Sequence, residues 1–227
     1  GVEETISFCH KNDIAIEQCG KLIVATNEVE HERMLALYER AHENGLEVEL
    51  LDAVMLKVRE PNVKGCGAIF LRTTGIVDYP GMTRKMAALF CDLGGQTQLN
   101  SQVVGINETN NMVDITLADG MHVEAKHLVV CAGLMADRLA IMQGLDIDFR
   151  VIPYRGEYYQ LPPDKSNIVK HLIYPVPNPL VPFLGIHLTR MIDGSVTIGP
   201  NALQGYKREG YGRLNFSVVD TFAMMSF

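Results

Sequence analysis

The feature that most constrains the fold is a change of pattern at Gly144. Before this residue, apolar positions recur at helical spacing in some segments and at strand spacing in others, which predicts a mixture of helices and strands. After it, short apolar segments separated by turn residues predict strands at 150–161, 171–174, 183–190 and 195–199. Asp193-Gly194 is a typical hairpin turn between the last two strands. The sequence therefore predicts an α+β (mixed α/β) fold whose last part is a mostly antiparallel sheet.

The part before Gly144 has well-marked element ends. Asn27 is a suitable N-cap for a helix that stops near Gly45, where glycine favours termination. Asp119-Gly120 predicts a hairpin turn between two alternating segments. A run without alternation at 128–132 predicts a strand that is buried on both faces. The predicted helices are 2–12, 27–44, 52–59, 80–94 and 133–139, and the predicted strands are 22–25, 67–71, 97–106, 113–117, 121–125 and 128–132.

Composition narrows the class of function. The 227 residues are 47% hydrophobic and 21% charged, which is typical of a globular protein, and the net charge of -7 argues against a nucleic-acid binder. The five cysteines have no metal-ligand spacing and are expected to be buried free thiols. Histidines and acidic residues never reach ligand spacing either, so no metal site is predicted. No apolar run approaches the roughly 18 residues that a membrane span requires.

The segment from helix 80–94 to Gly133 resembles the unit that completes the FAD-binding domain of flavoproteins with two dinucleotide folds. In that interpretation Val103 and Val104 present backbone groups to the adenine. Ala132, Gly133 and Leu134 approach the dinucleotide closely, because glycine leaves room for it. The alternative is an ordinary βαβ unit with a meander.

The glycine-rich phosphate loop of such domains, G-x-G-x-x-G, does not occur in this sequence. The nearest cluster, Gly65-Cys66-Gly67, does not open a helix. Without this loop no helix N-terminus is available for the pyrophosphate. We therefore expect the chain by itself to bind FAD weakly or not at all.

Two segments after Gly144 carry candidate site residues. Strand alternation places Arg155, Glu157 and Tyr159 on one face, and the planar guanidinium of Arg155 suits a carboxylate. An Arg155–Glu157 pair is the alternative. His187 and Thr189 share a face of a later strand, and His187 could take a proton from a substrate hydroxyl. Its alternative is a structural histidine. Lys207-Arg208-Glu209 is expected to be a charged surface cluster.

These segments, together with several others, resemble the L-2-hydroxyglutarate oxidase/dehydrogenase family, within the wider group of glycerol-phosphate and D-amino-acid oxidase-like FAD enzymes. The similarity covers essentially the whole chain in order. The matching segments are Cys19–Thr26, Arg59–Asn62, Cys131–Leu139, Pro153–Tyr158, His171–Pro177 and Phe183–Pro200. The resemblance implies an FAD domain interleaved with a mostly antiparallel substrate domain. It assigns 1–79 to a helical segment of the substrate domain, 80–149 to part of the FAD-binding domain and 150–227 to the antiparallel substrate sheet.

The resemblance also implies FAD-dependent oxidation of L-2-hydroxyglutarate to 2-oxoglutarate. His187 is then the catalytic base, with Arg155, Tyr174, Thr189 and Arg190 as substrate-binding residues. The chain is expected to be an internal, inactive fragment, since the implied N-terminal FAD loop and C-terminal segment have no counterpart in it. A membrane quinone is the implied electron acceptor, with a cytoplasmic location and peripheral attachment to the inner membrane as a further option. The alternatives are a related FAD oxidoreductase of amines or glycerol 3-phosphate, and a non-catalytic ligand-binding domain.

Overall fold

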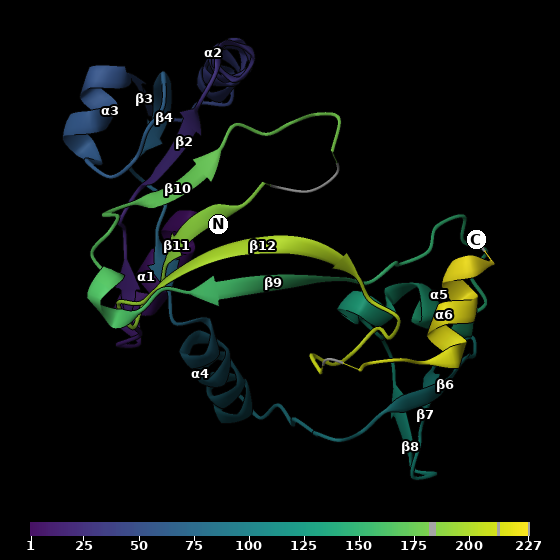
Figure 1. Cartoon of the computed structure of the whole chain (residues 1–227). Coiled ribbons are helices and arrows are strands. Elements are labelled where there is room, and N and C mark those ends of the chain that lie inside the picture. The colour runs from purple at the N-terminus through teal and green to yellow at the C-terminus, as the bar shows by residue number, and fades with distance from the viewer. Residues whose placement is uncertain (182–184, 213, 227) are drawn as a thin grey trace. The chain divides into compact units, whose positions relative to one another are not determined.

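The computed structural model describes residues 1–181, 185–212 and 214–226 (Figure 1). The chain divides into two compact units, and each is built from separate stretches of sequence. Unit 1 contains Gly1–Gly94 and Gly156–Ala202, and unit 2 contains Gly95–Arg155 and Leu203–Phe227. The mixture of helices and several sheets confirms the predicted α+β class.

The largest sheet has seven strands. Five of its six neighbouring pairs are defined residue by residue, and only β2 and β10 run parallel; the other four pairs are antiparallel. The predicted mostly antiparallel sheet is therefore confirmed. In order across the sheet, the strands are β3 (Val48–Asp52), β4 (Gly67–Leu71), β2 (Lys21–Ala25), β10 (Leu172–Pro175), β11 (His187–Arg190), β12 (Val196–Gln204) and β9 (Tyr154–Gln160).

The helices of unit 1 begin where the sequence provides caps. Asn27 Oδ1 accepts a hydrogen bond from Glu30 N at 3.0 Å, and the helix that follows ends just before Gly45, whose φ is 69°. Asp52 and Asp78 cap the next two helices in the same way. The helices are α1 (Val2–Lys11), α2 (Glu28–Glu43), α3 (Ala53–Arg59) and α4 (Tyr79–Asp92), and β1 (Ile16–Glu17) pairs with β5 (Ile76–Val77). The predicted helix positions are thus confirmed.

The core of unit 1 lies on both faces of the sheet. Leu22 and Val24 point to one face, where they pack with Leu56 of α3. Ala25 points to the other face, where it packs with Met34 of α2. Because side chains alternate along a strand, Lys21 shares the face of Ala25. That face continues beyond α2 across β10 and β11, and the candidate site lies there.

Unit 2 contains an antiparallel meander of β6 (Val103–Glu108), β7 (Val113–Leu117) and β8 (His122–Ala125). The hairpin predicted at Asp119-Gly120 is confirmed, and Gly120 has the positive φ of 86° that favours glycine there. The meander is followed by a 3-10 turn, η1 (Gly133–Met135), and by α5 (Ala136–Met142). Helix α6 (Val218–Met225) completes the unit.

The strand predicted at 128–132 is wrong, and so is the Ala-Gly strand end assigned to the FAD-binding segment. These residues form no strand, and Val129 is 83% exposed. A buried strand needs hydrogen-bonding neighbours on its edges, and none of the strands in the described residues lies beside this segment. The predicted strand 183–190 begins at His187, and its residues 183 and 184 lie outside the described residues.

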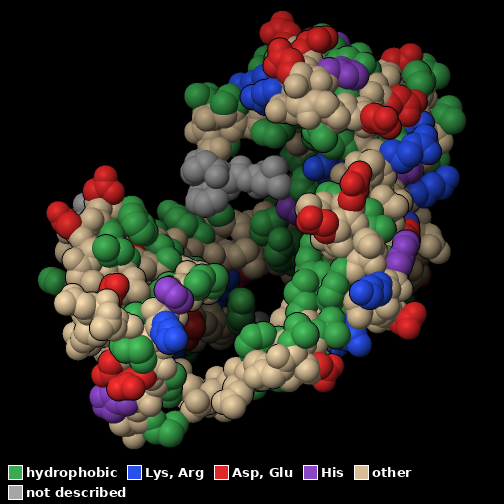
Figure 2. Space-filling model, turned by 180° about the vertical axis from the view of Figure 1, so that it is seen from behind, with side chains coloured by type: hydrophobic (Ala, Val, Ile, Leu, Met, Phe, Trp, Pro, Cys, Tyr) green, Lys and Arg blue, Asp and Glu red, His purple; other side chains and the backbone are tan. Residues whose placement is uncertain are grey.

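The expectation of five buried thiols is only partly correct. All five cysteines are free, but Cys91 and Cys131 are exposed while Cys9 is buried. None of the helices in the described part of the chain has the length and apolar character that a bilayer span needs. On the face drawn in Figure 2, lysine and arginine side chains lie interspersed with acidic ones.

Candidate functional site

Three of the predicted site residues meet on one face of the large sheet in unit 1. Ile173 of β10 pairs with Leu188 of β11, so the antiparallel register places Tyr174 beside His187 on the opposite face of both strands. Thr189 lies on that same face, two residues along β11. We call Tyr174, His187 and Thr189 the β10–β11 cluster.

His187 is held in a defined orientation. It is 7% exposed, and its ring stacks on Tyr174 with centroids 4.1 Å apart and planes 14° from parallel. Tyr158 of β9 meets it edge-on at 6.4 Å. His187 Nδ1 lies 3.0 Å from the Gly185 carbonyl oxygen, which can only accept a hydrogen bond. We infer that Nδ1 carries the proton, so in the neutral ring Nε2 keeps the lone pair that a general base needs.

Tyr174 and Thr189 are directly linked. Burial raises the pKa of the Tyr174 phenol, and its hydrogen bond with the Thr189 side chain acts in the opposite direction. The phenol therefore stays protonated near neutral pH. It can serve as a hydrogen-bonding group beside His187, but not as a base.

Sequence reasoning missed Lys21, which lies against the same ring. Its Nζ is 5.4 Å from the centroid of Tyr174. Burial lowers the pKa of the Lys21 ammonium. The signal in the sequence was a lysine at the first position of an otherwise apolar strand, but only the pairing of β2 with β10 shows which residues it joins.

Arg190 lies apart from the β10–β11 cluster. Alternation turns its side chain to the other face of β11. There it forms an ion pair with Glu17 at 3.1 Å and donates from Nη1 to the Lys170 carbonyl oxygen at 2.7 Å. Its predicted role in substrate binding stays a prediction.

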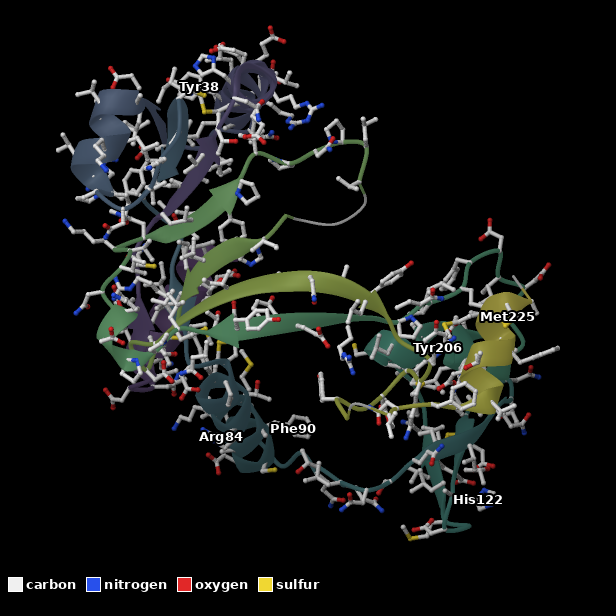
Figure 3. The ribbon with its side chains drawn as sticks, in the orientation of Figure 1. Tyr38, Arg84, Phe90, His122, Tyr206 and Met225 are labelled. Atoms are coloured by element: carbon white, nitrogen blue, oxygen red, sulfur yellow. The ribbon has the colours of Figure 1, made fainter. Side chains whose placement is uncertain are left out.

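Unit 2 contains a pocket of about 760 Å³ that brings Leu134 and Arg155 into one lining. Arg155 donates from Nη1 to the Gly212 carbonyl oxygen at 3.1 Å. The wall also contains Lys207 and Tyr206, and Tyr206 is labelled in Figure 3. Arg208 and Glu209 line the pocket too, and Arg208 is already paired with Asp137. Three basic side chains against one acidic one make this pocket suitable for an anionic ligand. The predicted roles of Leu134 and Arg155 stay predictions.

The prediction that Lys207-Arg208-Glu209 forms a surface cluster is wrong for Arg208, which is 6% exposed. Its guanidinium binds both carboxylate oxygens of Asp137 and donates from Nη1 to the Leu134 carbonyl oxygen at 2.7 Å. Asp220 accepts from Arg208 N at 2.9 Å and also pairs with Arg138. The hydrogen bond with Arg208 lowers the pKa of Asp137 to about 2. The charges are buried because each is paired, which a charge run in the sequence does not reveal.

The predicted cofactor residues lie in unit 2, and their contacts with FAD stay a prediction. Gly133 has a φ of 51°, and a Cβ added there would meet nothing within 4 Å, so its backbone is open to a close neighbour. Val103 and Val104 lie at a bulge in β6, and Val104 is 47% exposed. Both features leave the backbone accessible to a ligand, whereas the described residues offer no glycine-rich phosphate loop. Among the described residues there is also no group of three or more potential metal ligands.

A family model described as FAD dependent oxidoreductase matches residues 2–224. The L-2-hydroxyglutarate dehydrogenase of Escherichia coli (strain K12) is 50% identical to the chain, over 99% of this chain and 53% of that protein. The mitochondrial L-2-hydroxyglutarate dehydrogenase of Homo sapiens is 39% identical, over 94% of this chain and 49% of that protein. The chain spans about half the length of the curated relatives it matches.

Solved structures share the fold. The glycine oxidase of Geobacillus kaustophilus superposes with a TM-score of 0.76 at 17% identity, over 99% of this chain and 58% of that one. The L-alpha-glycerophosphate oxidase of Mycoplasma pneumoniae, with FAD bound, superposes with a TM-score of 0.75 at 22% identity, over 91% of this chain and 57% of that one. The family match covers nearly every residue of the chain, and the chain therefore belongs to the FAD dependent oxidoreductase family.

Proposed function

We propose that the protein containing this chain oxidises L-2-hydroxyglutarate to 2-oxoglutarate with FAD as cofactor. The observation that carries the proposal is the β10–β11 cluster, in which a buried histidine offers Nε2 as a base beside two hydroxyl groups. The identity to proteins named L-2-hydroxyglutarate dehydrogenase supports this choice of 2-hydroxy acid.

The chemistry assigned to this chain is proton transfer and orientation. His187 Nε2 takes the proton of the C2 hydroxyl, while the hydrogen bond between Nδ1 and the Gly185 carbonyl holds the ring in place. Tyr174 and Thr189 hydrogen-bond the substrate oxygens and fix C2 for reaction. Bound FAD supplies the acceptor for the hydride that leaves C2, so that the alcohol becomes a ketone. Arg155 lies in unit 2, and its proposed role in binding a carboxylate is a separate assignment that rests on its fork-shaped guanidinium and its place in the wall of the unit 2 pocket.

The residues assigned to the cofactor are part of this proposal. Val103 and Val104 would contact the adenine side, and Ala132, Gly133 and Leu134 would line the dinucleotide. The open backbone at Gly133 supports this assignment. A Gly133→Val substitution would place a side chain where the cofactor must approach, and should weaken FAD binding in the protein that carries the phosphate loop.

A substrate panel tests the proposed reaction. The flavin-loaded protein is mixed anaerobically with L-2-hydroxyglutarate, D-2-hydroxyglutarate, glycine or glycerol 3-phosphate, and bleaching of the flavin absorbance is followed. We expect rapid bleaching with L-2-hydroxyglutarate alone. Reduction by glycine or glycerol 3-phosphate instead would favour an amine or glycerol phosphate oxidoreductase, and bleaching by none would favour a ligand-binding role.

The electron acceptor is a separate part of the proposal. From the resemblance we infer a membrane quinone that a cytoplasmic protein reaches by peripheral attachment to the inner membrane. Reduction of a soluble ubiquinone analogue, together with sedimentation of the protein with lipid vesicles, tests this inference. If the quinone reoxidises the reduced flavin rapidly but the protein does not sediment with vesicles, the quinone stands as the acceptor and the membrane attachment is wrong.

A further inference from the structure

Lys21 occupies an unusual position for a lysine. It is the first residue of β2, it pairs with Leu172 of β10 and Leu71 of β4, and it is only partly exposed. A lysine on a central strand normally extends its ammonium into water. Here the ammonium lies 5.4 Å from the centroid of the Tyr174 ring instead.

The charge of Lys21 has no anionic counterpart in the described residues, where no ion pair or hydrogen bond to a carboxylate reaches its Nζ. Burial is the cause of its lowered pKa, with no opposing contribution from an acidic group. Removing water from an ammonium group raises the free energy of the folded state unless an anionic partner compensates for it. Such a group on the face that carries a candidate base is therefore a candidate for binding an anionic ligand.

We propose that Lys21 binds the C5 carboxylate of the substrate and so selects dicarboxylic 2-hydroxy acids over monocarboxylic ones. This inference rests on the proposed function, since His187 must act at the C2 hydroxyl. Lys21 and His187 both contact the ring of Tyr174, at 5.4 Å and 4.1 Å from its centroid. Because both distances end at the same centroid, the Lys21 ammonium and the His187 ring are separated by no more than the sum of the two, which a five-carbon dicarboxylate with its hydrogen bonds can span.

The ring of Tyr174 also explains how the cation is retained. Its face attracts the ammonium and partly offsets the loss of water. Its hydroxyl is fixed by Thr189. Tyr174 therefore contacts both the cation and the base on one face of the sheet.

Two substitutions test the role of charge at this position in the flavin-loaded protein. Lys21→Met keeps much of the apolar stem and removes the charge, and Lys21→Arg keeps the charge. Lys64→Met removes an exposed lysine of the same unit as a matched control. Turnover is measured with L-2-hydroxyglutarate and with L-2-hydroxybutyrate, which lacks the second carboxylate.

For Lys21→Met we expect the KM for L-2-hydroxyglutarate to rise by roughly 10- to 100-fold, the range for a lost charge-assisted hydrogen bond, with kcat within about threefold. Kinetics with L-2-hydroxybutyrate should stay unchanged, and Lys21→Arg should recover most of the affinity. An equal loss for both substrates, or no loss for either, overturns the proposal. If the Lys21→Met variant has a much lower melting temperature than the parent protein, the same kinetics are measured with the Lys21→Gln variant.

A binding experiment separates this inference from the proposed function. Glutarate has both carboxylates but no hydroxyl to oxidise, so its affinity can be measured by calorimetry whatever the reaction is. Suppose that the parent protein does not oxidise L-2-hydroxyglutarate but binds glutarate 10-fold or more tightly than the Lys21→Met variant does. The proposed reaction would then be wrong, and the role of Lys21 as a carboxylate ligand would stand. Equal glutarate affinity in the two proteins rejects the lysine.

Discussion

At the scale of single residues, the β10–β11 cluster combines side chains from two paired strands. His187 and Thr189 follow from strand alternation alone, since both lie on one strand two residues apart. Tyr174 was assigned to the site by resemblance, and its stacking on His187 depends on the pairing of two strands. Lys21 was missed because β2 and β10 pair across a long stretch of sequence, which no local pattern reports.

Replacing His187 tests its assignment as the base. His187→Ala should reduce turnover of L-2-hydroxyglutarate by roughly 10² to 10⁴, the range for loss of a general base. The exposed His10→Ala serves as the control, with steady-state kinetics as the measurement. If the His187→Ala variant turns over L-2-hydroxyglutarate within a factor of a few of the parent rate, His187 has a structural role and is not the base.

The pH dependence of stability tests the buried pair of Asp137 and Arg208. The pKa of Asp137 is about 2 in the folded chain, below its ordinary value of 3.8. Because the pKa is lowered on folding, the ionised carboxylate of Asp137 stabilises the folded state. This contribution is fully present above about pH 4 and is lost as pH falls toward 2. The loss amounts to about 2 kcal/mol.

Urea unfolding of the protein between pH 6 and pH 2 measures this loss. Asp137→Asn removes the titrating group, so its free energy of unfolding should be lower at pH 6 but should depend less on pH below 4. Removing one partner of a buried ion pair costs roughly 3–5 kcal/mol. Parallel curves for Asp137→Asn and the parent protein would show that another carboxylate is responsible.

At the scale of elements, helix ends were the most predictable features. Caps act within one turn, so Asn27 and Gly45 identify the ends of α2 without knowledge of the fold. Strands depend on their neighbours instead. The apolar run at 128–132 has the composition of a buried strand, but no strand in the described residues pairs with it. Arg208 was misplaced for the same reason, because its partner Asp137 lies 71 residues earlier.

The cap of α2 gives a test at this scale. Asn27→Ala leaves a backbone N–H without its side-chain acceptor and should lower the free energy of unfolding by about 1 kcal/mol. Asn27→Asp keeps an acceptor oxygen and should change stability by only a few tenths of that amount. Chemical denaturation followed by circular dichroism measures both. Equal stability of all three proteins would mean that the cap contributes nothing.

At the scale of the whole molecule, composition and pattern predicted the class of fold but not the boundaries of its units. Helix α4 lies in unit 1, and its assignment to the FAD-binding segment is not tested by this division. The assignment of 1–79, 80–149 and 150–227 to cofactor and substrate domains stays a prediction, because compactness does not show what a unit binds.

The missing phosphate loop leads to a prediction for the chain as a whole. The 227 residues contain candidate contacts for adenosine but no G-x-G-x-x-G turn. The purified chain, mixed with excess FAD and desalted, should therefore show no visible flavin band. A retained yellow colour after desalting would contradict the assignment of the phosphate site to a segment outside these residues.

The buried ion pairs of unit 2 also affect synthesis on the ribosome. Asp137 emerges 71 residues before Arg208, and Arg138 emerges 82 residues before Asp220. At translation rates of roughly 5–20 residues per second, the carboxylate of Asp137 waits about 4–14 s for its cation. The meander can form from local contacts in that time, but Asp137 has to stay hydrated until the loop that carries Arg208 is synthesised. Slower translation of residues 203–220 should thus lengthen the period in which nascent unit 2 is open to proteases.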